Sequence, residues 1–213
     1  MSESLARFSR AFAACPLVAV LRGLTPGEAP AIGDALVDAG FTILEVPLNS
    51  PDPFESIGLL AERLAGRALV GAGTVLKADE VRSVRDAGGE IIVSPDVNVE
   101  VIRATVSGGL VSLPGYLTPT EALAALDAGA HALKLFPVEG LPLSLLKAQR
   151  AVLPAATKVL AVGGITPGNI ADWRRAGANG FGIGSNLFYP GKDAADVARD
   201  AMAFVAAVQE DSQ

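Results

Sequence analysis

Short apolar runs alternate with amphipathic stretches along most of the chain. Residues 4–14 come first, with Leu5, Phe8 and Phe12 on one side at helical spacing, which predicts a short N-terminal helix. Eight apolar runs follow at intervals of roughly 20–27 residues, the period expected of a minimal barrel of alternating strands and helices. The runs are 17–21, 42–46, 68–71, 90–93, 110–113, 131–136, 158–162 and 180–183. Residues 193–209 form the last amphipathic stretch and predict a final helix.

Helix boundary signals recur between these runs. Four stretches end in Ala-Gly, where glycine supplies the left-handed conformation after a helix; the glycines are Gly40, Gly88, Gly129 and Gly177. Four stretches begin with an N-cap residue and a proline: Thr25-Pro26, Ser50-Pro51, Thr118-Pro119 and Thr166-Pro167. The pattern predicts an α/β fold, a (β/α)8 TIM barrel with a short N-terminal helix, as a single domain over residues 1–213. A doubly wound open sheet is the alternative, which the eightfold count disfavours.

Two charged side chains interrupt otherwise apolar runs. Lys134 lies in the middle of the sixth run, and lysine is almost never fully buried unless it is paired or used. Burial disfavours the charged form of an amine, and a neutral amine attacks ketones. Glu45 is the corresponding carboxylate in the second run. If both side chains point into one barrel they share a pocket, either as nucleophile and general acid/base or as a structural ion pair.

Polar and glycine-rich segments follow several runs, at the strand ends where such barrels place their active sites. Arg22 is a candidate clamp for a carboxylate or phosphate, or else a rim arginine paired to an acid. Thr74 could donate a hydrogen bond to a carboxylate, or only cap a tight turn. After runs seven and eight, backbone N–H groups and a short helix starting at Ser185 are predicted to hold a phosphate, ordinary glycine turns being the alternative. The residues are Gly163, Gly164, Gly184 and Ser185.

Composition narrows the function classes. The net charge is −6 and no run of lysine or arginine occurs, which argues against nucleic acid and an anionic membrane as partners. The single cysteine, Cys15, and the single histidine, His131, exclude a cysteine cluster and a histidine-rich zinc site. A lone cysteine fits a cytoplasmic protein. The charged N-terminus argues against a signal peptide, and no apolar run is long enough to span a bilayer.

The motifs together resemble those of the class I 2-keto-3-deoxy-6-phosphogluconate/galactonate aldolase family over nearly the whole chain. They are LVAVLRG at 17–23, GAGTV at 71–75, TPTE at 118–121, KLFP at 134–137 and VGGI at 162–165. The resemblance implies Lys134 as the Schiff-base lysine and Glu45 as the general acid/base. It also implies that Arg22 and Thr74 bind the pyruvyl carboxylate, and that the glycine-rich ends of runs seven and eight bind the substrate phosphate. No metal or other cofactor is expected, and the family suggests a homotrimer.

Two positions are similar to the galactonate branch of this family. Asn49 stands where gluconate enzymes typically have arginine, and Val162 stands where they typically have a threonine that contacts the C4 hydroxyl. The two substrates are epimers at C4. The resemblance therefore implies cleavage of 2-dehydro-3-deoxy-6-phosphogalactonate to pyruvate and D-glyceraldehyde 3-phosphate. Asp96 and Tyr116 depart from the family pattern and could alter the shape of the pocket.

Three alternatives stay open at this point. The first is a gluconate-specific or dual-specific aldolase. The second is a phosphate-binding barrel isomerase or synthase, which shares the glycine-rich strand ends but forms no lysine adduct. The third is a non-catalytic sugar-phosphate sensor in which Lys134 and Glu45 form a structural ion pair. The sensor predicts that Lys134→Met is strongly destabilising, because it orphans Glu45.

Overall fold

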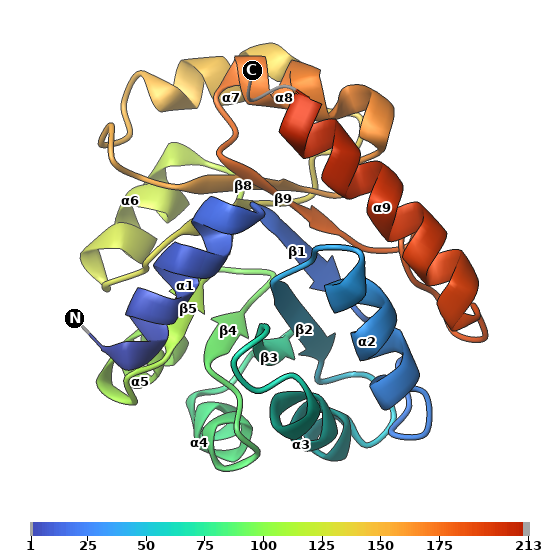
Figure 1. Ribbon diagram of the computed structural model, residues 1–213. Helices are drawn as coiled ribbons and strands as arrows, with labels where there is room; N and C mark the ends of the chain where they lie inside the picture. The colour runs from blue at the N-terminus through green and yellow to red at the C-terminus, as the bar shows by residue number, and fades with distance from the viewer. Residues whose placement is uncertain (1, 211–213) are drawn as a thin grey trace.

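The computed structural model describes residues 2–210 and contains a nine-stranded, all-parallel sheet. Hydrogen-bonded neighbours follow the order β5-β4-β3-β2-β1-β9-β8-β7-β6. Figure 1 shows the strands at the centre with helices around them. The strands are β1 (Leu17–Val20), β2 (Ile43–Pro47), β3 (Leu69–Gly73), β4 (Ile91–Val93), β5 (Val111–Leu113), β6 (Gly115–Tyr116), β7 (Leu133–Leu135), β8 (Val159–Val162) and β9 (Gly180–Ile183).

The sheet closes on itself through one interrupted strand. β5 pairs with β4, β6 pairs with β7, and only Pro114 separates β5 from β6 along the chain. Proline has no N–H to donate to a ladder, so it divides one run into two short strands. The two ends of the strand order are therefore joined through a single residue, Pro114. The predicted eight-run (β/α)8 barrel is confirmed, and the open doubly wound sheet is excluded.

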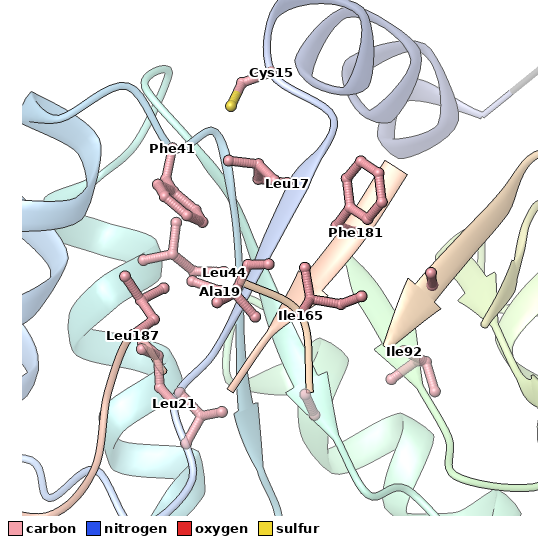
Figure 2. Close-up of a cluster of buried hydrophobic side chains, with 14 of the residues drawn as sticks. Cys15, Leu17, Ala19, Leu21, Phe41, Leu44, Ile92, Ile165, Phe181 and Leu187 are labelled. Atoms are coloured by element: carbon pink, nitrogen blue, oxygen red, sulfur yellow. The ribbon is translucent and has the colours of Figure 1, made fainter. Parts of the chain in front are cut away.

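The helices form an outer layer around the strands. Figure 2 shows part of the apolar layer between them, in which Leu17, Ala19 and Leu21 belong to the same cluster as Phe41 and Phe181. The described helices are α1 (Glu3–Ala14), α2 (Ala29–Asp38), α3 (Pro53–Arg63), α4 (Ala78–Asp86), α5 (Val99–Ser107), α6 (Pro119–Asp127), α7 (Leu143–Arg150), the 3₁₀ turn η1 (Pro167–Asn169), α8 (Ile170–Ala176) and α9 (Ala194–Glu210). Within residues 2–210, no helix combines the length and apolar character needed to cross a membrane.

The predicted helix boundaries are partly right. Thr118 caps α6 in a capping box with Glu121, as expected, and all four Ala-Gly stops have a glycine with positive φ. The predicted start at Ser50-Pro51 is wrong. The helix α3 begins at Pro53 after Asp52, and the Ser50 hydroxyl instead accepts a hydrogen bond from the N–H of Gly23. Ser50 therefore joins the loops after β1 and β2 rather than capping a helix.

The helix α1 closes the N-terminal end of the barrel. Phe8 and Phe12 are buried with their ring centroids 5.4 Å apart, and they pack into the apolar cluster that fills the barrel interior. Gly180 lies against this helix, since a Cβ there would come within 2.7 Å of the Phe12 ring. With one end filled by apolar side chains, the other end of the barrel is left to hold the polar groups.

Candidate active site

Side-chain alternation along two strands directs Glu45 and Lys134 into the barrel. On β2, Ile43 belongs to the interior cluster and Leu44 to the outer layer, so Glu45 shares the face of Ile43. On β7, both neighbours of Lys134 pack outward, which leaves Lys134 facing inward. The two side chains line the same interior cavity. The structure thus brings together the two charged residues that the sequence marks as anomalous.

The carboxyl group of Glu45 is buried without full compensation. Glu45 is 1% exposed, and its Oε2 has no hydrogen-bond partner in the described part of the protein. Burial raises the pKa of Glu45 to about 7, while the positive charges of Lys134 and Arg22 act in the opposite direction. A carboxyl group with this pKa exchanges a proton readily near neutral pH, which is what a general acid/base requires.

The space for this carboxyl group is provided by a glycine. A Cβ on Gly73, at the end of β3, would lie 1.9 Å from Glu45 Oε2. No side chain can be added there without moving the carboxylate. The glycine-rich end of β3 therefore makes room for the Glu45 carboxyl group.

We expect Gly73→Ala to lower kcat/KM by on the order of 10²-fold, because the added methyl group displaces the carboxyl that exchanges the proton. Overpacking of this kind also destabilises a protein by about 1–3 kcal/mol. The matched control is Gly27→Ala, since a Cβ on Gly27 meets nothing within 4 Å. Steady-state kinetics and urea unfolding of both variants measure the two effects. Wild-type kinetics in Gly73→Ala contradict this role of Gly73.

The amine of Lys134 lies in surroundings that favour its neutral form. Lys134 is 7% exposed, and burial lowers its pKa; Glu45 opposes this shift and Arg22 adds to it. Its Nζ lies 4.7 Å from the centre of the Phe136 ring. Glu45 acts on this amine through its charge, and Glu45 Oε2 makes no hydrogen bond with it. The arrangement fits an available amine better than a fully satisfied structural ion pair.

Above the interior cavity, the C-terminal strand ends form a cleft of about 520 Å³. Lys134 lies in the lining of both spaces and so connects them. Of the nine predicted site residues, seven line the cleft: Arg22, Lys134, Val162, Gly163, Gly164, Gly184 and Ser185. Glu45 lines the interior cavity only, and Thr74 lines neither space.

The glycine-rich ends of β8 and β9 form one side of the cleft. Gly163 and Gly164 have φ values of 107° and 65°, a left-handed conformation that glycine adopts without strain. In the described part of the chain, the N–H groups of these two residues and of Ser185 make none of the hydrogen bonds that hold the neighbouring turns. The predicted short helix at Ser185 is a single turn over residues 185–187. Free N–H groups in such turns are suited to an anion.

Arg22 follows β1, the strand that pairs with β9, and lines the cleft next to the glycine-rich end of β9. Its Nη1 donates a hydrogen bond of 2.8 Å to Oδ1 of Asn49. Asn49 is neutral, so it orients the guanidinium without cancelling its charge, unlike the acid of the rim-arginine interpretation. Thr74 follows β3 and has a φ of 54°, which is strained for a β-branched residue. Its predicted role as a carboxylate donor stays a prediction.

The sequence analysis did not identify several residues that line the cleft. Gly182 lies opposite Val162, and a Cβ there would come within 2.8 Å of Val162 Cγ2, so the pair shapes this wall together. The alternation of β9 could have identified Gly182, because Phe181 packs outward. Phe136, Phe188, Tyr189 and Pro190 also line the cleft. They lie on loops, where no periodicity reports orientation.

The two departures from the family pattern lie outside the cleft. Tyr116 is buried in the outer layer, and its hydroxyl is hydrogen-bonded to Gln149 of α7 at 3.1 Å. The expectation that Tyr116 alters the pocket is therefore wrong, because its side chain points toward the helices. Asp96 is exposed and does not line the cleft. Among residues 2–210, no group of three or more histidine, cysteine or acidic residues is placed to hold a metal ion.

A parallel barrel with a buried amine, a buried carboxyl and glycine-rich turns at one end defines a barrel enzyme of the aldolase class. The family model of KDPG and KHG aldolase matches residues 9–200, and the chain belongs to this family of carbon–carbon lyases. A probable 2-dehydro-3-deoxy-6-phosphogalactonate aldolase of Rhizobium meliloti (strain 1021) is 48% identical over 192 residues, which cover 90% of this chain and 91% of the relative.

Relatives named for the galactonate and the gluconate substrate differ in their sequence identity to this chain. The 2-dehydro-3-deoxy-6-phosphogalactonate aldolase of Escherichia coli (strain K12) is 47% identical over 92% of this chain and 95% of its own. A 2-dehydro-3-deoxy-phosphogluconate aldolase of Zymomonas mobilis is 35% identical over 71% of this chain and 72% of its own. A solved native KDPGal structure superposes with a TM-score of 0.91 at 46% identity, over 93% of this chain and 96% of the other. The chain is thus more similar to these galactonate-named proteins.

Proposed function

We propose that this protein is a class I aldolase that cleaves 2-dehydro-3-deoxy-6-phosphogalactonate to pyruvate and D-glyceraldehyde 3-phosphate. The observation that carries the proposal is the shared cavity of Lys134 and Glu45, directly beneath a cleft with glycine-rich turns. The names of the relatives at 47–48% identity support the choice of substrate. Barrel isomerases and synthases share only the glycine-rich turns, and nothing in their chemistry needs a neutral buried amine.

In the proposed mechanism the neutral amine of Lys134 attacks the C2 carbonyl of the substrate. Loss of water from the resulting carbinolamine gives an iminium ion, which accepts electrons far better than a ketone. Burial of the amine matters at this step, because only the unprotonated form has an electron pair to donate. Since the iminium withdraws electrons, cleavage of the C3–C4 bond leaves an enamine rather than a free carbanion.

Glu45 moves the proton in the same mechanism. Its carboxylate accepts the proton of the C4 hydroxyl, through a bridging water, as the C3–C4 bond breaks and the aldehyde forms. The pair of electrons from this bond passes to the enamine. The enamine then gains a proton at C3, and water releases pyruvate and restores the amine of Lys134. A carboxyl group with a pKa of about 7 takes up and returns this proton with little driving force in either direction.

Substrate orientation follows from the groups that line the cleft. We assign the pyruvyl carboxylate to Arg22, held by Asn49, with Thr74 as a further donor. The phosphate binds the N–H groups of Gly163, Gly164 and Ser185, with Gly184 allowing close approach. Lys134, on β7 beside β8, lines the same cleft. Val162 and Asn49 are the proposed determinants of C4 configuration.

The configuration at C4 gives the direct test of substrate choice. Condensation of pyruvate with D-glyceraldehyde 3-phosphate, followed by NMR assignment of C4 in the product, is expected to give the galactonate configuration in large excess. Val162 favours this result, because an apolar side chain offers no hydrogen bond to the C4 hydroxyl of the other epimer. A product with mainly the gluconate configuration contradicts the substrate assignment but leaves the aldolase chemistry intact.

The proposal also covers the location of the protein, its oligomeric state and its cofactors. We propose a cytoplasmic homotrimer in which each chain is one domain and uses no metal or other cofactor. Large apolar side chains on the described surface support an oligomer; those at least 39% exposed are Phe54, Leu76, Leu117, Leu123, Val152, Tyr189 and Met202. Sedimentation equilibrium measures the number of chains per particle.

A further inference from the structure

A second buried lysine lies behind the cleft and contacts the loop that forms one of its walls. The side chain of Lys192 is 5% exposed and does not line the cleft. Its ammonium group donates to the carbonyl oxygen of Leu187 at 2.6 Å and to Oδ2 of Asp200, on α9, at 2.5 Å. A buried ammonium is costly unless it is paired, and these two oxygens supply the pairing.

The loop held by this lysine carries part of the proposed phosphate site. Residues 184–190 contribute six side chains or backbone groups to the cleft: Gly184, Ser185, Asn186, Phe188, Tyr189 and Pro190. The carbonyl of Gly184 accepts hydrogen bonds from the N–H groups of Leu187 and Phe188, at 2.8 and 3.0 Å. The segment is therefore a helical turn, whose first N–H groups point away from its last carbonyl groups.

Lys192 and the proposed phosphate act on opposite ends of this turn. The carbonyl of Leu187 is at its C-terminal end, and the N–H of Ser185 is at its N-terminal end. A cation at the carbonyl end is electrostatically favourable and restricts rotation of the turn. The ammonium also lies 5.5 Å from the ring centre of Tyr189, and the Lys192 N–H donates to the Tyr189 carbonyl at 3.1 Å. One residue thus holds this wall of the cleft at two points.

We propose that Lys192 is a positioning residue, which holds the Leu187 carbonyl against Asp200 of α9 and thereby aims the N–H of Ser185 at the substrate phosphate. The inference rests on the proposed function, which places the phosphate at this turn. Lys192 touches no substrate, so its effect is confined to substrates that carry a phosphate. Formation of the pyruvate adduct at Lys134 does not depend on it.

The test compares Lys192→Met with Arg199→Met as a matched control. Arg199 is the other cation bonded to Asp200, at 3.2 Å, but it is 65% exposed and is absent from the cleft lining. Two measurements are made: the ratio of kcat/KM for D-glyceraldehyde 3-phosphate to that for D-glyceraldehyde in the condensation with pyruvate, and the rate of borohydride trapping with pyruvate alone. We expect Lys192→Met to lower the ratio about tenfold, the scale of one lost charge-assisted hydrogen bond, with trapping unchanged. Arg199→Met is expected to change the ratio less than about twofold.

A second pair of variants covers the case in which Lys192→Met does not fold. Lys192→Gln keeps a donor for the Leu187 carbonyl but removes the charge, and Asp200→Asn keeps the ammonium on Leu187 but removes its counter-ion. Both are expected to give smaller losses of the same ratio. The role of Lys192 is overturned if the rate of borohydride trapping falls as much as the ratio of the two kcat/KM values. It is also overturned if this ratio is unchanged in the variants that fold. A wild-type protein that does not distinguish the two aldehydes overturns the phosphate site itself.

Discussion

Lys134→Met is expected to lower kcat/KM by on the order of 10⁶-fold, the scale seen when an enzyme loses its covalent nucleophile. Methionine preserves the length and apolar stem of lysine but has no amine, so no iminium forms at C2 and the C3–C4 bond has no electron acceptor. The readout is a coupled assay for released pyruvate, together with intact-mass measurement after incubation with pyruvate and borohydride. In the wild-type protein, the mass adduct should map to Lys134. In the variant it should be absent.

The same variant separates catalysis from a structural ion pair. Removing one partner of a buried ion pair is strongly destabilising because it leaves the other partner charged and uncompensated, so the cost is small where that partner is already neutral. Within residues 2–210, Glu45 Oε2 makes no hydrogen bond, and the carboxyl is already shifted toward its neutral form, with a pKa of about 7. We therefore expect Lys134→Met to unfold in urea at the wild-type midpoint or above it. The sensor alternative predicts two different results: Lys134→Met is strongly destabilised, and the wild-type protein binds the sugar phosphate without turnover. These results together contradict the aldolase.

Glu45→Gln is expected to lower kcat/KM by on the order of 10²- to 10⁴-fold, the usual contribution of a general acid/base. Glutamine occupies the same volume next to Gly73 but cannot accept the C4 hydroxyl proton. The pyruvate adduct at Lys134 should still accumulate on long incubation, since that reaction uses the amine. Absence of the adduct in this variant shows instead that Glu45 is needed to form the iminium.

The pH profile gives an independent test of Glu45. The mechanism needs Glu45 ionised and Lys134 neutral, and both states are reached by loss of a proton. Activity of the wild-type protein should therefore rise with pH through about 7, where Glu45 titrates. In Glu45→Gln the part of this rise that comes from Glu45 should disappear, which leaves only the rise that comes from Lys134. In wild-type protein, a profile that is flat between pH 5.5 and about 8.5 contradicts the assignment.

Stability should depend on pH in the opposite direction. Glu45 has an ordinary pKa near 4.5 in the unfolded chain and about 7 in the folded protein, so the folded protein binds more protons between these values. Stability therefore falls as pH rises from about 4.5 to about 7. Glu45→Gln escapes this loss and is expected to be more stable than wild type at pH 8, by up to about 3 kcal/mol. Urea unfolding at pH 4.5 and pH 8 measures the difference, which should vanish at the lower pH.

Much of the barrel follows from local pattern. The spacing of apolar runs gives the strands, and the Ala-Gly stops end helices where glycine adopts positive φ. Helix starts were less predictable, because proline is compatible with more than one loop position. At Ser50-Pro51 the serine bonds to Gly23 across the loop, and Pro53 begins the helix instead. The closed barrel is predicted, but the division of its fifth run at Pro114 into β5 and β6 is not, since it depends on which strands meet.

The residues of the site were recognisable one by one, but their relationships were not. Lys134 and Glu45 are conspicuous because each is a charge in an apolar run, and strand alternation assigns each to one face. No local rule says that Gly73 makes room for the Glu45 carboxyl, or that Asn49 orients Arg22. Tyr116 shows the converse, since its position in the sequence suggested the pocket while its hydroxyl bonds to Gln149 on the outer layer.

The sequence by itself determined the class of fold and the chemical groups available, because periodicity, capping and residue type act over a few neighbouring positions. Only the tertiary structure decided that β2 and β7 bring Glu45 and Lys134 to the same cavity, and that Lys192 anchors the loop after β9. The physical reason is that closure of the sheet determines which interior side chains lie at the same height along the barrel axis. Burial raises the pKa of Glu45 and lowers the pKa of Lys134, so it favours the neutral form of each group. This burial is the sum of contributions from atoms in many segments that are distant in the sequence.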